Sequence, residues 1–509
     1  MRRGWIYWGL AIGAFVVLGT ASVWMGSLNQ DEGWYLYAAQ MVADGAVPYR
    51  DFFFTQGPLL PFVYSAFAWV WRDWGLLGAR VLTLAIGAAG LVFAMALARR
   101  LVREDARPVA ALAVFLLLGS NLYHLYYLAI PKTYALASLF VMMGFYLLSV
   151  AADGKRPVAI LAGLSLAFAS GARISLGAML AVCGLWLLWS RQWKTLVWFC
   201  LGGFAGLVLV YGPFVLDEKT LSGLLAAQKY HAARGGFDPT WVVGSFSRLV
   251  RWYLPVFVLL GLRLFSPRAN TPYHPNLPNI PNLPNFSSLL LLSFLAVFAV
   301  QMLAPFPYED YQVPIMGLLA VSTVVGSLPL FPSPSSLLPP PLFLLLVLGM
   351  TWACSFGSPL LEKWSTNGQD RFWSLKKQKT EMAQLRDVAR EINAIDPGGK
   401  DILTQDLYLA IETGRKVPKG LEMGPFAMLS DVEWRTLLHA APCEIAALSG
   451  YSFAICPPKC DERPIGTQME YWSILKRRYS LVSREENFGQ NQTTLLVLKR
   501  KRPDGKAKE

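Results

Sequence analysis

Two adjacent carboxylates, Asp31 and Glu32, follow directly after the first apolar run of the chain. Acidic side chains this close to a membrane segment are costly unless they face water or take part in chemistry. A carboxylate here can deprotonate an attacking hydroxyl group, and a pair can help to hold a divalent cation. The plainer interpretation is a helix cap, because Asp is a common N-cap residue. Asp31 and Glu32 are therefore the first candidates for catalytic residues.

The stretch that these carboxylates open, residues 31–61, carries a second charged pair, Arg50 and Asp51. A guanidinium group can bind a phosphate, and a carboxylate beside it can position an acceptor or a cation. A simple surface ion pair explains Arg50 and Asp51 equally well.

Further polar side chains stand at the ends of later apolar runs. Cations gathered at the level of lipid headgroups suit a phosphate or diphosphate group carried by a lipid. Ordinary interfacial placement of long basic side chains is the alternative, above all for Lys132 and Lys229. The basic candidates are Lys132, Arg173, Lys229, His231 and Arg234, and the acidic and aromatic candidates are Glu309, Asp310 and Tyr311.

The composition is that of a membrane protein with many spans. Of 509 residues, 54% are hydrophobic and only 16% are charged, which is far from the average soluble domain. The formal net charge of +13 comes from short basic clusters between apolar runs, as the positive-inside rule expects. This pattern argues against nucleic acid as a partner and for the lipid bilayer.

The apolar runs predict a polytopic α-helical protein with about eleven transmembrane helices. Arg2 and Arg3 place the N-terminus in the cytoplasm, so Asp31 emerges on the outer side of the plasma membrane. The segment Gly57–Trp74 is short and rich in Trp, which favours a helix in the interface over a span. The predicted spans are Trp5–Met25, Leu76–Ala98, Val109–Asn121, Thr133–Ala152, Pro157–Gly171, Ile174–Trp189, Thr195–Leu216, Leu249–Phe265, Ser287–Ala304, Val313–Leu330 and Leu342–Phe356.

The segments between the spans divide the chain into two predicted domains. Residues 1–356 form the transmembrane domain, with an outer loop at 26–75, another at about 217–246, and a cytoplasmic linker rich in Pro and Asn at 266–286. Residues 357–509 form a small extracytoplasmic α/β domain. Its predicted elements are a helix at 376–395, strands at 401–404, 453–456 and 494–498, and a helix at 469–479.

Three cysteines lie in the C-terminal region: Cys443, Cys456 and Cys460. On the outer side of the membrane, two of them can form a disulfide and leave one thiol over. A zinc site is the alternative, with His439 as the nearest fourth ligand.

The N-terminal pattern resembles the GT-C membrane glycosyltransferases, in particular the protein O-mannosyltransferase and lipid A aminoarabinose transferase group (family 39-like). The likeness is best over residues 1–200 and weaker to 356. It implies that Asp31 is the catalytic carboxylate, with Glu32 beside it. Asp51 before Gly57-Pro58-Leu59 resembles the Asp that this group places before a Pro turn, although Gln56-Gly57 replaces the usual His-Pro or Pro.

The same resemblance assigns roles to two cations. Gly171-Ala172-Arg173 fits the arginine that the group carries between its fifth and sixth spans. Ile130-Pro131-Lys132-Thr133 stands where many relatives have an Arg and an Asp, so Lys132 takes over a phosphate contact.

These observations predict an inverting glycosyltransferase, mannosyltransferase-like, which uses a polyprenyl-phosphate-linked sugar as donor. The acceptor is a lipid, a glycan or a protein, and a divalent cation is a candidate cofactor. Two alternatives are a flippase for lipid-linked glycans and a non-catalytic membrane scaffold. The flippase is disfavoured because transporters place polar residues near the middle of the bilayer, whereas the candidates here stand at the ends of the runs.

Overall fold

The computed structural model describes residues 2–233, 235–265, 286–328, 340–367, 374–427, 429–450 and 467–501. The chain divides into two compact units. The first contains Met1–Val23, Thr55–Leu60 and Val81–Ser358, and the second contains Trp24–Phe54, Pro61–Arg80 and Pro359–Glu509. Each is described separately below.

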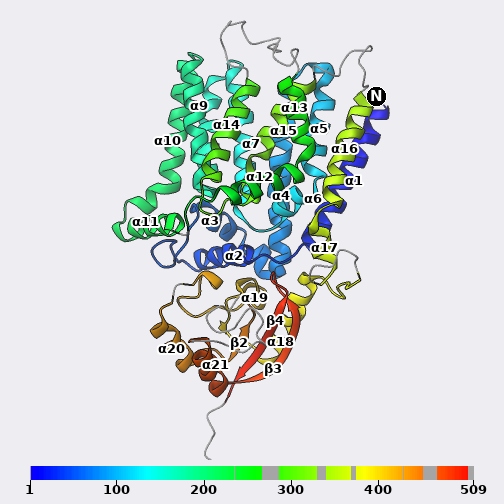
Figure 1. The fold of residues 1–509 in the computed structure, drawn as a ribbon. Helices are drawn as coiled ribbons and strands as arrows, with labels where there is room; N and C mark the ends of the chain where they lie inside the picture. The colour runs from blue at the N-terminus through cyan, green and yellow to red at the C-terminus, as the bar shows by residue number, and fades with distance from the viewer. Residues whose placement is uncertain are drawn as a thin grey trace, which may run out of the picture. The chain divides into compact units, whose positions relative to one another are not determined.

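The first unit is built from apolar helices, many of which run side by side (Figure 1). Within the described residues, four helices are long and apolar enough to cross a membrane, and counting three sharply bent helix pairs as spans raises the number to seven. The chain is therefore a multi-pass membrane protein. Its helices are α1 (Arg2–Met25), α5 (Arg107–Gly119), α6 (Leu122–Ala129), α7 (Thr133–Ala152), α8 (Ala159–Ala172), α9 (Ala178–Trp189), α10 (Trp193–Val215), α11 (Glu218–Ala233), α12 (Pro239–Trp252), α13 (Leu254–Phe265), α14 (Phe286–Met302), α15 (Met316–Ser327) and α16 (Pro340–Phe356). The helices α3 (Leu59–Ala66) and α4 (Ala68–Arg100) contribute residues to both units.

Several predicted spans match helices closely, and α7 has both of its predicted ends. Helix α11 and the first part of α12 occupy the predicted outer loop at about 217–246, and its place outside the membrane stays a prediction. The predicted span Leu249–Phe265 contains the bend of 92° at which α12 and α13 meet, so it belongs to one of the bent helix pairs, and its straight apolar part is Leu254–Phe265. The predicted linker at 266–286 lies outside the described residues, except for Phe286.

Helices α8 and α10 are held together by small residues. Alanines and glycines recur every fourth position along α8, at 159, 163, 167 and 171, and Gly202 and Gly206 do the same on α10. A Cβ atom on Gly163 would overlap the carbonyl oxygen of Phe199, and one on Gly202 would overlap that of Ile160. Small residues at this spacing let helix backbones approach closely in a membrane. The packing fixes the end of α8, where Arg173 follows.

The second unit contains a four-stranded mixed sheet together with helices from both ends of the chain. The strand order is β1-β2-β4-β3, with β1 and β2 parallel and the other pairs antiparallel. The strands are β1 (Ile402–Leu403), β2 (Ile445–Leu448), β3 (Tyr479–Phe488) and β4 (Thr493–Arg500), and the helices are α2 (Gln30–Ala43), the start of α4, α17 (Pro359–Ser365), α18 (Glu381–Ile395), α19 (Leu407–Thr413), α20 (Asp431–Ala440) and α21 (Thr467–Arg478).

The sequence predicted α18, α21, β1 and β4 but missed β2 and β3. Strand β3 reads YSLVSREENF and is mostly exposed, so it lacks the apolar content that marks a buried strand. The predicted strand at 453–456 lies outside the described residues, as do Cys456 and Cys460.

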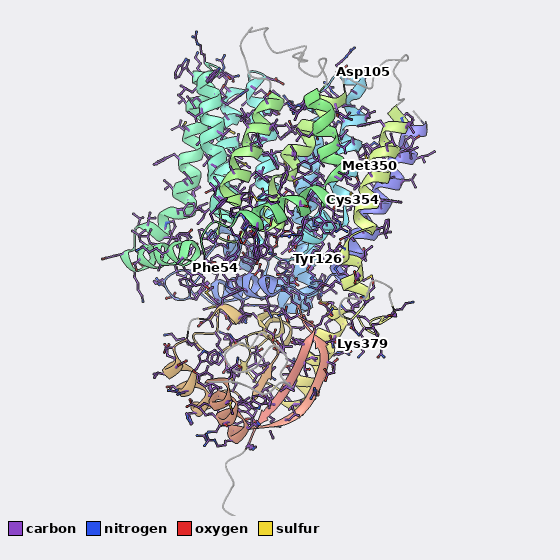
Figure 2. All side chains as sticks on the ribbon, in the orientation of Figure 1. Phe54, Asp105, Tyr126, Met350, Cys354 and Lys379 are labelled. Carbon is purple, nitrogen blue, oxygen red and sulfur yellow. The ribbon has the colours of Figure 1, made fainter. Side chains whose placement is uncertain are left out.

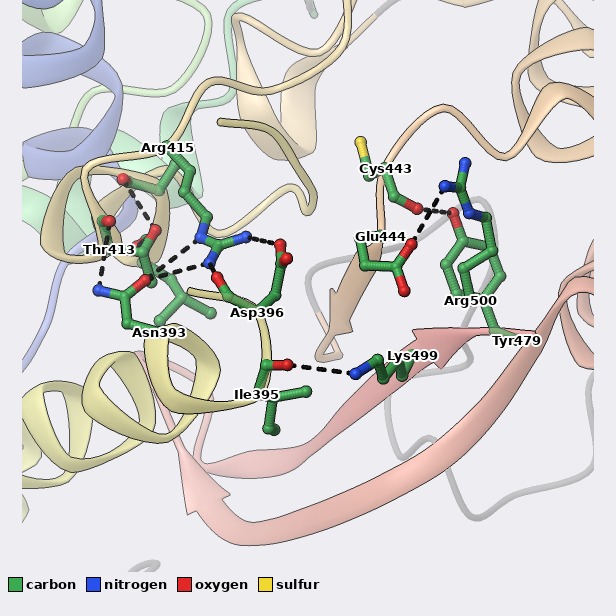
Figure 3. A network of polar contacts seen from close by, with 12 residues as sticks. Asn393, Ile395, Asp396, Thr413, Arg415, Cys443, Glu444, Tyr479, Lys499 and Arg500 are labelled. Carbon is green, nitrogen blue, oxygen red and sulfur yellow. Dashed lines mark hydrogen bonds and ion pairs between the residues drawn. The ribbon is translucent and has the colours of Figure 1, made fainter. Parts of the chain in front are cut away.

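Polar contacts join the strands to the neighbouring turns (Figure 3). Arg415 pairs with Asp396 at 2.6 Å, Arg500 pairs with Glu444 at 3.1 Å, and the Tyr479 hydroxyl donates to the Cys443 carbonyl at 2.9 Å. Arg415 is buried, so its pairing removes the cost of an isolated buried charge.

Candidate active site

A buried polar cluster lies in the first unit where α7 begins. Lys132 is the N-cap residue of α7, and its ammonium group lies 3.2 Å from the Asp310 carboxylate. The Tyr134 hydroxyl donates to the same carboxylate at 2.9 Å. Asp310 belongs to the short 3-10 helix Glu309–Ile315. All three side chains are buried, so the charges of Lys132 and Asp310 are held in a region of low dielectric constant.

Arg173 joins this cluster from the end of α8. Its guanidinium group lies 4.2 Å from the centre of the Tyr311 ring and 5.3 Å from that of Tyr134. Lys132 faces the rings of Tyr134 and Tyr127, at 4.9 and 5.6 Å. Aromatic faces attract cations and hold them where little water is present. The structure thus brings together four of the predicted residues: Lys132, Arg173, Asp310 and Tyr311.

The cluster holds two cations and a carboxylate close together. Lys132 pairs with Asp310 at 3.2 Å, Arg173 lies against the Tyr311 and Tyr134 rings, and Glu309 pairs with Arg248 at 3.0 Å. Basic side chains gathered in this way can bind an anionic group such as a phosphate.

Several buried polar atoms of the cluster's segments have no hydrogen-bond partner within the described residues. They are the Tyr123 hydroxyl, the Thr133 hydroxyl, and both amide atoms of Gln312. Thr133 follows Lys132 in the chain, and Gln312 follows Tyr311. A buried polar atom left without a partner costs free energy. These atoms therefore suit a polar ligand or ordered water.

Helix α12 fixes the segment that carries Glu309. Asp238 caps α12, and Pro239 occupies its first position. The Ser245 hydroxyl donates to the Pro307 carbonyl, and the Trp241 ring packs against Phe306. Glu309 is therefore held in an ion pair, and its predicted role in positioning an acceptor or a cation remains a prediction.

The stretch around Gly57 packs against the end of α8. A Cβ atom on Gly57 would overlap the Gly171 carbonyl oxygen and lie 3.1 Å from the Ser170 carbonyl oxygen. Only glycine permits this approach, which explains Gln56-Gly57 in place of the His-Pro or Pro expected from the resemblance. The contact lies two residues from Arg173.

In the second unit, Asp31 lies in the first turn of α2 and is half-buried. Asn29 caps this helix: its side chain accepts from the Asp31 backbone N–H at 3.0 Å, and its own N–H donates to Glu32 at 2.8 Å. Both carboxylates stand at the positive end of the helix dipole, which favours negative charge. The N-cap residue is thus Asn29 and not Asp31. Glu32 completes the capping box, and the Asp31 side chain lies outside it.

Glu32 is fully buried and forms an ion pair with Arg80. The Arg80 guanidinium donates to both Glu32 oxygens, at 2.6 and 2.9 Å, and to the backbone carbonyls of Gly26 and Ser27, both at 2.9 Å. Arg80 was missed at the sequence level because it lies inside the run predicted as the span Leu76–Ala98. A charged residue in an apolar run was the signal that could have found it.

The aromatic part of the loop packs around Phe54, which is fully buried (Figure 2). The rings of Trp34, Tyr35, Tyr49 and Phe52 all lie within 6.3 Å of it, measured between centroids. This cluster folds residues 34–54 back on α2, which steadies the helix that carries Asp31.

Arg50 and Asp51 form an exposed ion pair at 2.9 Å. Asp51 also accepts from the Val47 backbone N–H at 2.8 Å, which closes the turn in which Tyr49 has a φ of 68°. This is the surface pair that the sequence allowed. Binding of a phosphate or an acceptor by these residues remains a prediction.

Three further basic candidates come from the segment that begins with α11. Lys229 is exposed on α11, the side chain of His231 lies outside the description, and so does Arg234. Across the described ranges, no three His, Cys, Asp or Glu side chains come close enough together to hold a metal ion. The divalent cation stays a prediction.

Comparisons with known proteins bear on the fold. No protein-family model matches the chain, and no curated protein matches it. The chain is similar to crystal structures of ArnT from Cupriavidus metallidurans, bound to undecaprenyl phosphate and in the apo state. Both have 14% sequence identity, a TM-score of 0.61, and a match covering 98% of each chain.

The match to the Archaeoglobus fulgidus oligosaccharyltransferase is weaker, with 11% identity and a TM-score of 0.46 over 99% of this chain and 75% of that one. The likeness to ArnT confirms, at the level of the fold, the resemblance that the sequence predicted: this membrane protein has a GT-C fold.

Proposed function

We propose that this protein is a membrane glycosyltransferase that moves a sugar from a polyprenyl-phosphate donor to an acceptor hydroxyl at the outer face of the plasma membrane. The observation that carries the proposal is the buried cluster that brings the basic side chains of Lys132 and Arg173 together around Tyr134. The fold of ArnT, whose crystal structure contains undecaprenyl phosphate, supports it.

In this proposal Lys132 and Arg173 bind the phosphate of the donor. Transfer breaks the bond between the anomeric carbon and the phosphate oxygen, so negative charge grows on the leaving phosphate. Cations placed beforehand in a region of low dielectric constant stabilise that charge in the transition state. Asp310 and Tyr134 keep Lys132 in place, and Tyr311 keeps Arg173 in place.

Asp31 acts as the general base. Its carboxylate takes the proton from the acceptor hydroxyl while the hydroxyl oxygen forms the new bond to the anomeric carbon. The acceptor attacks the face opposite the phosphate, so the configuration inverts. The products are the glycosylated acceptor, the polyprenyl phosphate and a protonated Asp31, which returns its proton to water.

The proposed topology follows the basic residues. Arg2 and Arg3 keep the N-terminus in the cytoplasm, about eleven spans follow, and residues 357–509 lie outside the cell as an α/β domain. This arrangement puts Asp31 on the outer side, where Lys229, Arg50 and Glu309 also meet water and can contact an acceptor lipid, glycan or protein.

The test uses the purified full-length protein in lipid vesicles with a radiolabelled polyprenyl-phosphate sugar. Asp31→Asn should lower the rate of transfer by roughly 10²–10⁴-fold, the range that a general base contributes, with no change in the unfolding temperature. Asp73→Asn changes an exposed carboxylate near the start of α4; it is the matched control and should keep most of the activity. Near wild-type transfer by Asp31→Asn would remove the proposal.

A further inference from the structure

Backbone donors just before Asp31 are satisfied by side chains from the far end of the chain. The Leu28 N–H donates to Glu381 at 2.6 Å, and the Gln30 N–H donates to the Gln490 side-chain oxygen at 2.8 Å. The Gln30 amide also donates to Asp406 at 2.7 Å. The first N–H groups of a helix have no partner within it. Gln490 therefore caps α2 from a position 460 residues away in sequence.

The groups that hold this turn are themselves fixed. The second oxygen of Glu381 accepts from Lys377 at 2.6 Å, and both side chains are almost fully buried. Asp406 is buried and accepts from the Tyr408 hydroxyl at 2.9 Å. Buried groups with several partners have little freedom to move. The support for Leu28 and Gln30 is correspondingly rigid.

Close backbone packing prevents α2 from sliding over this support. A Cβ atom on Gly33 would overlap the Tyr408 backbone nitrogen, so α2 lies directly on α19. One on Gly489 would overlap the Tyr408 hydroxyl, so the hairpin between β3 and β4 lies against the same residue. Gly489 precedes Gln490, and this contact sets the position of the capping side chain.

Contacts through α4 also support the first turn of α2. Gly75 has a φ of 64° and interrupts α4, and the Glu412 carboxylate accepts from the Leu76 N–H at 2.8 Å. Arg80 follows one turn later and holds Glu32. Glu412 thus caps the helical stretch that supplies the partner of Glu32.

We infer that Glu381 and Gln490 belong to the active site's framework and act as positioning residues for Asp31. This inference rests on the proposed role of Asp31 as general base. Neither residue touches the reacting atoms; both act through the first turn of α2. Because small displacements of a catalytic group cost large factors in rate, loosening this turn lowers the rate of the chemical step.

The experiment compares three variants of the full-length protein in lipid vesicles. Gln490→Ala removes the cap and should lower kcat by about ten- to a hundredfold while the KM for the polyprenyl-phosphate donor stays within about twofold. Gln490→Glu keeps an oxygen for the Gln30 N–H and should restore most of kcat. Asn491→Ala, an exposed residue of the same hairpin, should behave as the unaltered protein.

All rates are measured well below the unfolding temperatures of the variants, so that each is fully folded. A role confined to stability would lower the unfolding temperature of Gln490→Ala but leave kcat unchanged, and that result would overturn the inference. Asp31→Asn separates this failure from failure of the proposed function. If Asp31→Asn transfers sugar normally, the proposed function is wrong; if it is inactive and Gln490→Ala has normal kcat, only the positioning role is wrong.

Discussion

Replacing Glu32 by Ala should destabilise the second unit strongly, although its neighbour Asp31 can be changed without that effect. Glu32 and Arg80 are both fully buried. Without Glu32, the Arg80 guanidinium loses the two hydrogen bonds that it donates to this carboxylate, together with the buried ion pair.

The magnitude follows from that burial. Breaking a buried ion pair by removing one partner costs about 3–5 kcal/mol. For a unit of about 200 residues, this corresponds to a fall of roughly 6–20 °C in the unfolding midpoint. Asp51→Ala is the matched control, because its pair with Arg50 lies in the same loop but is exposed. An exposed pair contributes about 0–1 kcal/mol.

The assay is thermal unfolding of the purified protein in detergent, followed by tryptophan fluorescence, with Asp31→Asn measured beside the other variants. The double variant Glu32→Ala/Arg80→Ala should lose less than the sum of the two single losses, because it leaves no buried charge unpaired. Equal midpoints for Glu32→Ala and Asp51→Ala would refute the reasoning, since the buried pair would then matter no more than the exposed one.

Two further outcomes test the packing of each unit. Gly163→Ala should destabilise the first unit by about 1–3 kcal/mol, because its Cβ would overlap the Phe199 carbonyl oxygen. The control is Gly184→Ala, whose Cβ would meet nothing within 4 Å and which should be neutral or slightly stabilising. Equal effects of the two substitutions in thermal unfolding would contradict the contact between α8 and α10. Burial raises the pKa of the Cys443 thiol from its ordinary 9.0 to about 12, so at pH 8 the native protein should react with iodoacetamide at this residue about a thousandfold more slowly than the unfolded protein, as mass spectrometry can measure. Because the folded state disfavours the Cys443 thiolate, the stability that comes from keeping this thiol protonated is complete below pH 9 and is lost as the pH rises towards 12. Alkylation of the native protein at the unfolded rate would contradict the burial of Cys443.

Local patterns were enough to predict much of the membrane part. The apolar run Thr133–Ala152 is bounded by polar residues on both sides, and α7 has those ends. The break in α4 at Gly75 falls where the run Leu76–Ala98 was predicted to begin. The bend between α12 and α13 was not predicted, although Pro255 lies beside it and proline interrupts or kinks a helix.

Partners that are distant in sequence explain what was missed at the site. The candidates Lys132, Arg173 and Asp310 were found from their places at the ends of apolar runs, but the ion pair between Lys132 and Asp310 joins residues 178 positions apart. Glu32 differs from Asp31 because it forms a buried ion pair with Arg80. Nothing in a single sequence indicates that Arg80 contacts either carboxylate. Pairing of this kind depends on the tertiary fold and has no periodicity of its own.

The remote cap on α2 also has a consequence for the order in which the protein is made. Gln490 leaves the ribosome 460 residues after Gln30, a delay of roughly 25–90 s at usual rates of synthesis. Throughout that time the Gln30 N–H lacks its native acceptor, and the Leu28 N–H lacks its own until Glu381, 353 residues later, has been made. The segment that carries Asp31 is thus among the first to be synthesised and among the last to reach its native structure, so a chain interrupted before its final hairpin is inserted in the membrane without a finished site.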